Sequence, residues 1–309
     1  MTVAQYTKDQ ITKAPNAGLA HQQQQQKGAG EALLKQAAAL PTPKLADGHV
    51  DLNGRWTPPQ VFCDKSGKCQ LDTRLHGYAV FVDNQGIIHA DRLAPESSAS
   101  GVQNEKDGAE AFENLNGFFR ADRDTNKPPY KPELMAKVED LNVHENEVDP
   151  HMLCHPNGIP REGPPGRILQ TPNMMVFLYA DGENGNWWRV IPTDGRPHRT
   201  DLDPSYFGDS VAHWEGDTLV VDVNGFNDDT WLGTDGWFHS MAMHVVERFT
   251  RKGDTLKFET TVEDPQVLTQ PWVKNPVNLV LNTDPESEIY EVARCENQDI
   301  GHLVNHDHL

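Results

Sequence analysis

Histidines, aspartates and tryptophans gather in one loop in the second half of this chain. His239 lies between two strand-like segments, and Asp228, Trp231 and Trp237 precede it in the same loop. An imidazole has a pKa near neutrality, and a carboxylate that orients it makes it the commonest general acid or base in enzymes. We therefore predict that His239 is an acid–base residue and that Asp228 or Asp209 orients it.

A second candidate lies in residues 193–199, Thr-Asp-Gly-Arg-Pro-His-Arg. Glycine and proline indicate a turn followed by a rigid loop, where core packing does not explain a histidine. We predict that His198 and Arg199 stabilise negative charge that develops on a substrate. Aromatic walls would suit an apolar or aromatic ligand. The predicted binding residues are Trp231, Trp237, Trp214, Tyr206, Phe238 and His244.

These residues also have a purely structural explanation. With 14 histidines in the chain, some lie near aspartates by chance, and tryptophans in β-barrels usually belong to the core. His244 lies within a strand pattern and shares a face with Arg248, whereas Glu247 and Phe249 point to the other face. A Glu or Arg on the interior face of a small barrel must be paired, and this would make it a site candidate in its own right.

The many histidines could alternatively bind a metal ion. His151 and His155 are four residues apart, but the prolines around them disfavour a helix that would align them. His306 and His308 lie at the C-terminal end. We expect no metal and no cofactor, and a metal-dependent hydrolase is only the third functional hypothesis.

The elements that must hold these residues are β-hairpins. The tetrapeptide Gly-Asp-Thr-Leu occurs at 216–219 and again at 253–256, each time between alternating runs that are typical of strands. A repeated hairpin indicates an antiparallel meander, which we expect to close into a barrel because closure removes exposed edges. The predicted strands cover 210–214, 218–223, 244–250, 255–262, 78–82, 87–90, 168–170, 174–179, 187–191, 277–281 and 288–293.

The remainder of the chain is less regular. Residues 1–46 contain a glutamine tract and an Ala- and Leu-rich segment, so we predict a low-complexity leader and a short helix over 31–40 that Pro41 ends. Residues 47–309 should form a single barrel-like domain with an irregular insertion at about 94–167. Helices are expected at 108–119 and 132–141. The proline-rich segment 149–161 should be an ordered loop, a kind that is often functional.

Charge and hydropathy exclude some classes of partner. The net charge is −19, with acidic residues spread along the chain, and such a surface repels nucleic acid and anionic lipid. No apolar run is long enough to span a bilayer. We expect a small apolar molecule as the partner, and a homo-oligomer is compatible with the sequence.

The four cysteines suggest two disulfides. Cys63 and Cys69 flank a turn-like pentapeptide that could bring two strand ends within bonding reach, which leaves Cys154 and Cys295 as the second pair. The alternative is four thiols in a cytosolic protein. A zinc site is disfavoured because the spacing of the first two cysteines is too wide. No signal peptide is visible at the start of the chain, and we expect that a leader has been removed.

Several motifs carry a family resemblance. The Gly-x-Trp at 54–56 resembles the opening of lipocalin-like (calycin) barrels. The segments Trp-Glu-Gly-Asp-Thr-Leu-Val-Val-Asp (214–222), Gly-Phe-Asn-Asp (225–228), His-Val-Val-Glu-Arg-Phe (244–249) and Cys-His-Pro-Asn-Gly-Ile-Pro-Arg (154–161) resemble a large family of exported, uncharacterised bacterial proteins. The resemblance covers about residues 50–303 and implies a periplasmic or secreted protein. Phe238 and Met241 stand where the family often has Pro and Glu.

The calycin resemblance implies a kind of chemistry. Calycin-type barrels that are enzymes work without cofactors on small apolar molecules. The first hypothesis is therefore a lyase, hydratase or isomerase of an aromatic or terpenoid-like compound, and the second is a non-catalytic periplasmic binding protein. The interior separates them, because an enzyme of this kind needs a convergent His–carboxylate pair there, whereas a carrier needs only an apolar cavity.

Overall fold

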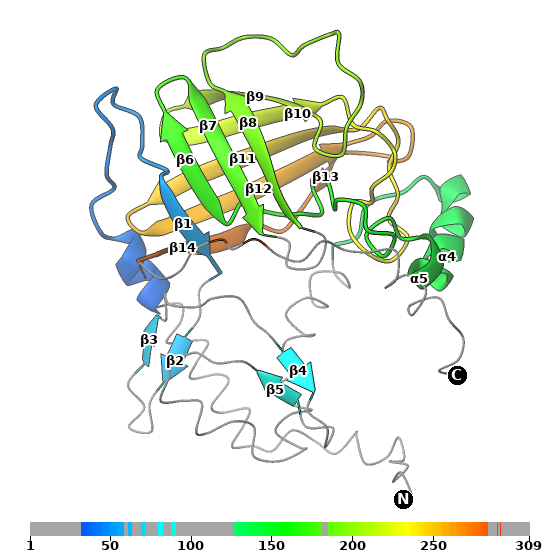
Figure 1. The fold of residues 1–309 in the computed structure, drawn as a ribbon, viewed down its shortest axis with the longest axis horizontal. Helices are drawn as coiled ribbons and strands as arrows, with labels where there is room; N and C mark the ends of the chain where they lie inside the picture. Colours follow the sequence, from blue (N-terminus) through cyan, green and yellow to red (C-terminus); the bar gives the residue numbers. More distant parts are fainter. Residues whose placement is uncertain are drawn as a thin grey trace, which may run out of the picture.

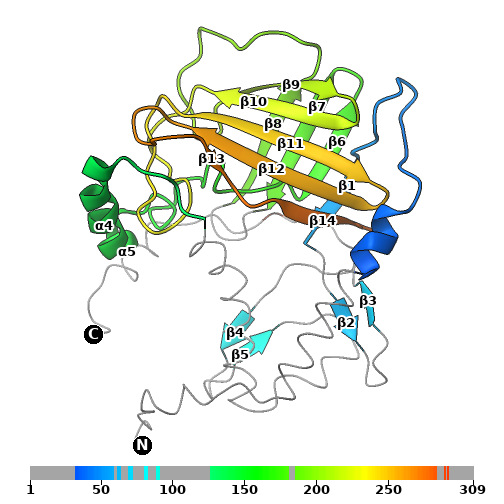
Figure 2. The same cartoon turned by 180° about the vertical axis from the view of Figure 1, so that it is seen from behind.

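The fold comes from a computed structural model that describes residues 32–58, 126–180, 185–283, 289 and 291, together with the backbone of four short strands between residues 61 and 90 (Figures 1 and 2). The helix expected at 108–119, most of the strand expected at 288–293 and Cys295 lie outside these residues.

One antiparallel sheet dominates the structure, in the order β8-β7-β6-β1-β14-β12-β11-β10-β9, with β13 paired to β12. The edge strands β8 and β9 come close to each other without pairing, so the sheet forms a nearly closed barrel, and the mainly antiparallel β fold is confirmed. The strands are β1 Gly54–Thr57, β6 Arg167–Thr171, β7 Met174–Ala180, β8 Asn186–Pro192, β9 Asp209–Glu215, β10 Thr218–Asn224, β11 His244–Lys252, β12 Thr255–Glu263, β13 Trp272–Val273 and β14 Val277–Asn282.

Two small hairpins precede this sheet in the sequence. β2 (Val61–Cys63) pairs with β3 (Cys69–Leu71), and β4 (Val80–Val82) pairs with β5 (Ile88–Ala90). The second hairpin agrees with the strands predicted at 78–82 and 87–90. The register of the first places Cys63 directly opposite Cys69.

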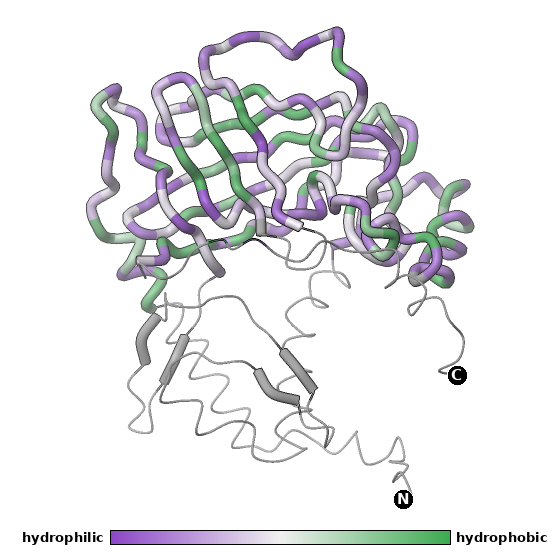
Figure 3. Tube along the Cα trace, viewed as in Figure 1, coloured by the Kyte–Doolittle hydropathy of each residue, from purple (hydrophilic) through white to green (hydrophobic). Residues whose placement is uncertain are grey.

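The two Gly-Asp-Thr-Leu segments form the expected hairpins. β9 pairs with β10 and β11 pairs with β12, each through a tight turn that contains the Gly-Asp dipeptide. Gly216 and Gly253 have φ of 62° and 53°, in the left-handed region that favours glycine. Burial alternates along β12, whereas Leu219, Val220 and Val221 of β10 are all buried; Figure 3 colours the sheet by hydropathy.

The barrel has two layers that cross. Figure 1 shows β6, β7 and β8 in front of β9 to β12. Phe177 of β7 packs edge-on against Phe249 of β11, with ring centroids 5.0 Å apart. Trp56 of β1 is buried, and its indole Nε1–H donates to the Leu52 carbonyl at 3.0 Å.

Different segments cover the two ends of the barrel (Figure 2). At one end, the short helix over 32–38 stops before Pro41 as predicted, and the Asp254 amide donates to the Ala37 carbonyl at 3.0 Å. At the other end, the loop after β10 packs against α4 (Met135–Val143), which follows the 3-10 helix Pro132–Leu134 and precedes α5 (Glu145–Val148), and the Lys131 amide donates to the Val267 carbonyl of the loop after β12 at 2.9 Å. The helix predicted at 132–141 is therefore confirmed. In the part of the chain described, no helix has the length and apolar character to cross a membrane.

Candidate functional site

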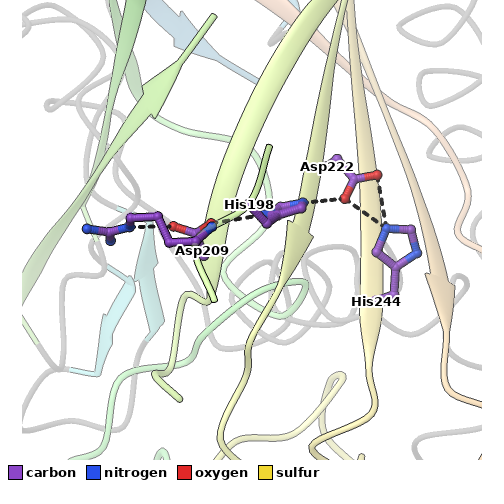
Figure 4. A network of polar contacts seen from close by, with 5 residues as sticks. His198, Asp209, Asp222 and His244 are labelled. Carbon is purple, nitrogen blue, oxygen red and sulfur yellow. Dashed lines mark hydrogen bonds and ion pairs between the residues drawn. The ribbon is translucent and has the colours of Figure 1, made fainter. Parts of the chain in front are cut away.

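A chain of histidines and carboxylates ties the loop after β8 to the sheet (Figure 4). His198, in that loop, lies between two strands' carboxylates: its Nδ1 is 3.0 Å from Asp209 Oδ2 of β9, and its Nε2 is 2.7 Å from Asp222 Oδ1 of β10. The Arg199 backbone amide also donates to Asp209 Oδ2, at 3.1 Å, and its Nε donates to Oδ1 at 3.3 Å. The predicted residues His198, Arg199 and Asp209 thus come together.

His244 extends the chain to β11 and β12. Its Nε2 is 3.0 Å from each oxygen of Asp222, and its Nδ1 is 3.4 Å from Glu263 Oε2. The sheet register explains these contacts, since His244 is directly opposite Glu263. Asp222 is therefore shared by two imidazoles, each of which has a second carboxylate at its other ring nitrogen. We refer to Asp209, His198, Asp222, His244 and Glu263 as the outer histidine chain.

The name reflects where these side chains point. Along β10, Asp222 alternates with the buried Val221 and Val223, and along β11, His244 alternates with the buried Val245. The outer histidine chain therefore lies on the outside of the barrel. His198 keeps 20% of its side chain exposed and His244 keeps 33%. The predicted placement of a His–carboxylate pair within a barrel pocket does not describe this arrangement.

Both ring nitrogens of His198 and of His244 lie within 3.4 Å of a carboxylate oxygen. Burial alone would raise the pKa of the Asp222 carboxyl, but the hydrogen bonds from His198 and His244 outweigh burial and hold that pKa below its ordinary value. All four ring nitrogens are engaged by carboxylates, so the outer histidine chain is well suited to hold the loop after β8 on the sheet.

His239 occupies a different environment from the one predicted. It is buried with 3% exposure, its Nε2 is 2.6 Å from Thr230 Oγ1, and its Nδ1 is 3.1 Å from the Ser240 carbonyl. Since a carbonyl can only accept, Nδ1–H donates to it and Nε2 accepts from the threonine hydroxyl. Asp228 is exposed to solvent. Burial lowers the pKa of His239, so a neutral imidazole holds this loop together.

This environment predicts a pH-dependent contribution to stability. Because the folded pKa of His239 lies below the unfolded value of about 6.5, the unfolded chain binds the proton more readily. We expect this contribution to be complete above about pH 6.5 and to be lost as the pH falls through the folded pKa. Urea unfolding between about pH 5 and pH 7.5 should show a shallower pH dependence for His239→Gln than for the wild type.

An exposed histidine provides the control for this experiment. His213 lies exposed on the outer face of β9, so His213→Gln is the matched exposed-histidine variant, measured under the same conditions. An unchanged slope in His239→Gln would show that the buried ring is not the titrating group.

The predicted aromatic wall residues take structural positions. Trp231, Trp237 and Phe238 are at most 9% exposed and form the interior of the loop after β10, where Trp237 packs edge-on against Trp272 at 5.6 Å. Trp214 stacks on His49 at 4.7 Å near the other end of the barrel. Tyr206 packs edge-on against His155 at 5.9 Å. The structure does not gather these rings around His239 as one set of walls.

The remaining sequence candidates concern metals and cysteines. Among the described residues, no group of three or more histidine, cysteine or acidic side chains is arranged to hold a metal ion.

The thiol of Cys154 is not free. Its partner lies outside the described part of the chain, so the pairings Cys63–Cys69 and Cys154–Cys295 stay predictions.

A polar cluster that the sequence only partly indicated lies inside the barrel. Arg189 of β8 donates from Nη2 to Glu247 Oε2 of β11 at 2.6 Å, and the two side chains are 4% and 0% exposed. β8 and β11 are not neighbours in the sheet, so the pair spans the interior between the two layers. The alternation along β11 predicted that Glu247 and Arg248 lie on opposite faces and that the interior one must be paired, but it did not say which is interior, and no pattern identified Arg189 as the partner of Glu247.

Aromatic side chains surround this ion pair. Tyr179 is directly opposite Trp187 and Phe177 is directly opposite Arg189 in the β7–β8 register, so all four share the inner face. The Arg189 guanidinium lies 5.5 Å from the Phe177 ring centroid. The rings of Tyr179 and Trp187 lie 5.8 Å and 6.2 Å from Phe207, a residue of the loop after β8. We refer to Tyr179, Trp187, Arg189 and Glu247 as the inner polar cluster.

Each member of the inner polar cluster has an unsatisfied polar atom. Arg189 Nε and Nη1, Glu247 Oε1, Tyr179 Oη and Trp187 Nε1 are buried and have no hydrogen-bond partner in the described structure. Burial raises the pKa of Tyr179, so its hydroxyl keeps its proton. Burial would also lower the pKa of Arg189, but Glu247 reverses that effect and keeps the guanidinium charged. A compact set of buried donors and one acceptor therefore faces the barrel interior.

Comparison with known proteins adds no assignment. The chain matches no model of a protein family, no curated protein and no solved structure.

Proposed function

We propose that the protein binds a small molecule inside its barrel and that the inner polar cluster recognises it. The observation that supports this is the set of five buried polar atoms without a partner in the described structure. Leaving such an atom unsatisfied costs about 1–3 kcal/mol, and native proteins rarely leave several together. A ligand with complementary polar atoms would remove that cost.

The energetics of a buried ion pair support the same proposal. Removing two charges from water costs several kcal/mol, and apolar residues of similar volume often stabilise a protein as well or better. Arg189 and Glu247 are both almost fully buried, with one hydrogen bond between them. An ion pair that contributes little to stability is readily explained if it recognises a polar ligand. The aromatic rings around the pair would then contact the apolar part of that ligand.

Catalysis of the kind expected from the sequence is the second candidate. On the barrel strands described, His213 and His244 point outward, so His–carboxylate catalysis inside the barrel has no histidine there. A lyase, hydratase or isomerase would instead use Glu247 Oε1 as the base and the Tyr179 hydroxyl as the acid, two groups within one buried cluster. Product formation that Tyr179→Phe abolishes, without a loss of ligand binding, would favour this candidate.

Binding can be tested with a neutral fluorescent aromatic amine, N-phenyl-1-naphthylamine. We expect saturable binding of one molecule per chain, weakened about tenfold or more in Arg189→Met/Glu247→Leu. The matched control is Arg248→Met/Glu215→Leu, which removes an ion pair with the same 2.6 Å contact on the outer face of the barrel. Equal binding by all three proteins, or no binding by the wild type, would refute a site at the inner polar cluster.

Export is proposed on the family resemblance alone. A chain with two disulfides would have an intact mass lower than that of the reduced chain by the four lost hydrogens. Four alkylatable thiols in the native protein would contradict both the pairings and this location.

A further inference from the structure

We propose that the ligand is an uncharged aromatic molecule that carries both a hydroxyl group and a carbonyl oxygen. This inference rests on the proposed binding function and specifies the chemistry of the same site. It follows from the hydrogen-bonding capacity, the charge and the shape of the inner polar cluster.

The inner polar cluster offers more hydrogen-bond donors than acceptors. Arg189 offers Nε–H and Nη1–H, and Trp187 offers its indole N–H, all without partners in the described structure. An oxygen with lone pairs and no charge, such as a ketone or aldehyde carbonyl, satisfies donors of this kind. Glu247 Oε1 is the opposite case, because an ionised carboxylate can only accept, so it requires an O–H or N–H from the ligand. The Tyr179 hydroxyl can donate to the carbonyl of the ligand or accept from its hydroxyl.

The charges of the inner polar cluster exclude a charged ligand. The buried charged pair of the cluster, Arg189 on β8 and Glu247 on β11, is neutral as a pair. The half-buried Glu162, whose charge also acts on Tyr179, accepts a hydrogen bond from Asn157 at 3.2 Å. Arg251, also inward-facing on β11, already donates to the carbonyls of Gly253 and Asp51. A carboxylate or ammonium ligand would add an uncompensated charge beside Tyr179, Arg189 and Glu247, which are at most 5% exposed, at a large desolvation cost. The ligand is therefore neutral.

The shape of the surroundings favours a flat ring. The rings of Phe177 and Phe249 meet at 5.0 Å on one side of the cluster, and Phe207 lies against Tyr179 and Trp187 on another. Aromatic rings pack best against other rings in offset or edge-on contacts. A ring with a carbonyl at one end and a hydroxyl at the other presents its edges to the polar atoms and its apolar surface to the phenylalanines.

Four small compounds test the polar requirements one at a time. The probe is 4-hydroxyacetophenone, titrated by isothermal calorimetry. 4-Ethylphenol lacks the carbonyl, 4-methoxyacetophenone lacks the hydroxyl donor, and 4-hydroxybenzoate is charged at neutral pH. We expect each of the three to bind about tenfold more weakly or worse, because each leaves a buried partner unsatisfied or adds a charge.

Variants assign the contacts to residues. Tyr179→Phe removes only a hydroxyl and should weaken 4-hydroxyacetophenone while leaving the fold intact. Glu247→Gln replaces an acceptor-only group with an amide that also donates, so it should remove the preference for the hydroxyl over the methoxy compound. Arg248→Met/Glu215→Leu, on the outer face, should leave all affinities unchanged.

The outcomes separate this inference from the function on which it rests. Binding of N-phenyl-1-naphthylamine at the cluster, together with equal affinity for 4-ethylphenol and 4-hydroxyacetophenone, would overturn the ligand class and leave the binding function standing. Tighter binding of 4-hydroxybenzoate than of 4-hydroxyacetophenone would overturn the neutral charge of the ligand. If none of the compounds binds, water alone satisfies the cluster and both proposals fail.

Discussion

Arg189→Met should lower the free energy of unfolding by about 3–5 kcal/mol, because it leaves the Glu247 carboxylate buried without its counter-charge. Glu247 is fully buried, and Arg189 Nη2 is the donor to its Oε2 at 2.6 Å. Urea unfolding followed by tryptophan fluorescence and by circular dichroism would measure the loss.

The double variant Arg189→Met/Glu247→Leu should recover most of that stability. Both charges are removed, and the new apolar side chains have similar volumes in the interior beside Phe177. The single variant Arg248→Met is the control, since Arg248 pairs with Glu215 on the exposed face and should cost no more than about 1 kcal/mol. A double variant as unstable as Arg189→Met would mean that the pair stabilises the fold, and this would remove one argument for ligand recognition.

Asp222→Ala should release the loop over residues 193–208 from the sheet. Asp222 is the acceptor that joins His198 of this loop to His244 of β11, and its removal leaves both imidazoles with only one carboxylate each. Hydrogen bonds to a charged group are worth about 1.5–3 kcal/mol, and the half-buried setting of Asp222 places this site at the lower end of the range. Amide hydrogen exchange across the loop should then accelerate about tenfold or more.

The amides of Arg199 and Ser205 are direct reporters of this change, because they donate to Asp209 and to the Gly225 carbonyl. Asp203→Asn is the matched control, because it removes an exposed aspartate of the same loop. Exchange that rises equally in both variants would indicate a general charge effect. Unchanged exchange in Asp222→Ala would show that the loop is held by other contacts.

The inner polar cluster and the outer histidine chain lie on opposite faces of β10 and β11. Val221 of β10 is directly opposite Glu247 of β11, and the next residue along β10 is Asp222. Because side chains alternate along a strand, one cluster faces the interior and the other faces the loop after β8. That loop also contributes Phe207, which packs against Tyr179 and Trp187 of the inner polar cluster. Release of the loop in Asp222→Ala should therefore also affect ligand binding.

Local sequence patterns determined the strands of this protein and the faces of their side chains. The repeated Gly-Asp-Thr-Leu segments located the two hairpins, because a two-residue turn with a left-handed glycine fixes the register of the strands on either side. The period-two alternation of β11 placed His244 and Arg248 on one face and Glu247 on the other, but it did not show which face is buried, and His244 was predicted to line the pocket although it lies on the outer face. These are properties of short segments, and neighbouring residues suffice to specify them.

Tertiary structure alone decided which of these side chains meet. Arg189 and Glu247 are 58 residues apart and belong to strands that are not adjacent in the sheet, so only the curling of the sheet into two crossing layers joins them. His198 reaches Asp222, 24 residues away, because an irregular loop folds back over the outer face. His239 looked catalytic in sequence, yet its loop folds inward and buries it against Thr230. Such contacts depend on loop paths and barrel closure, which no short stretch of sequence encodes.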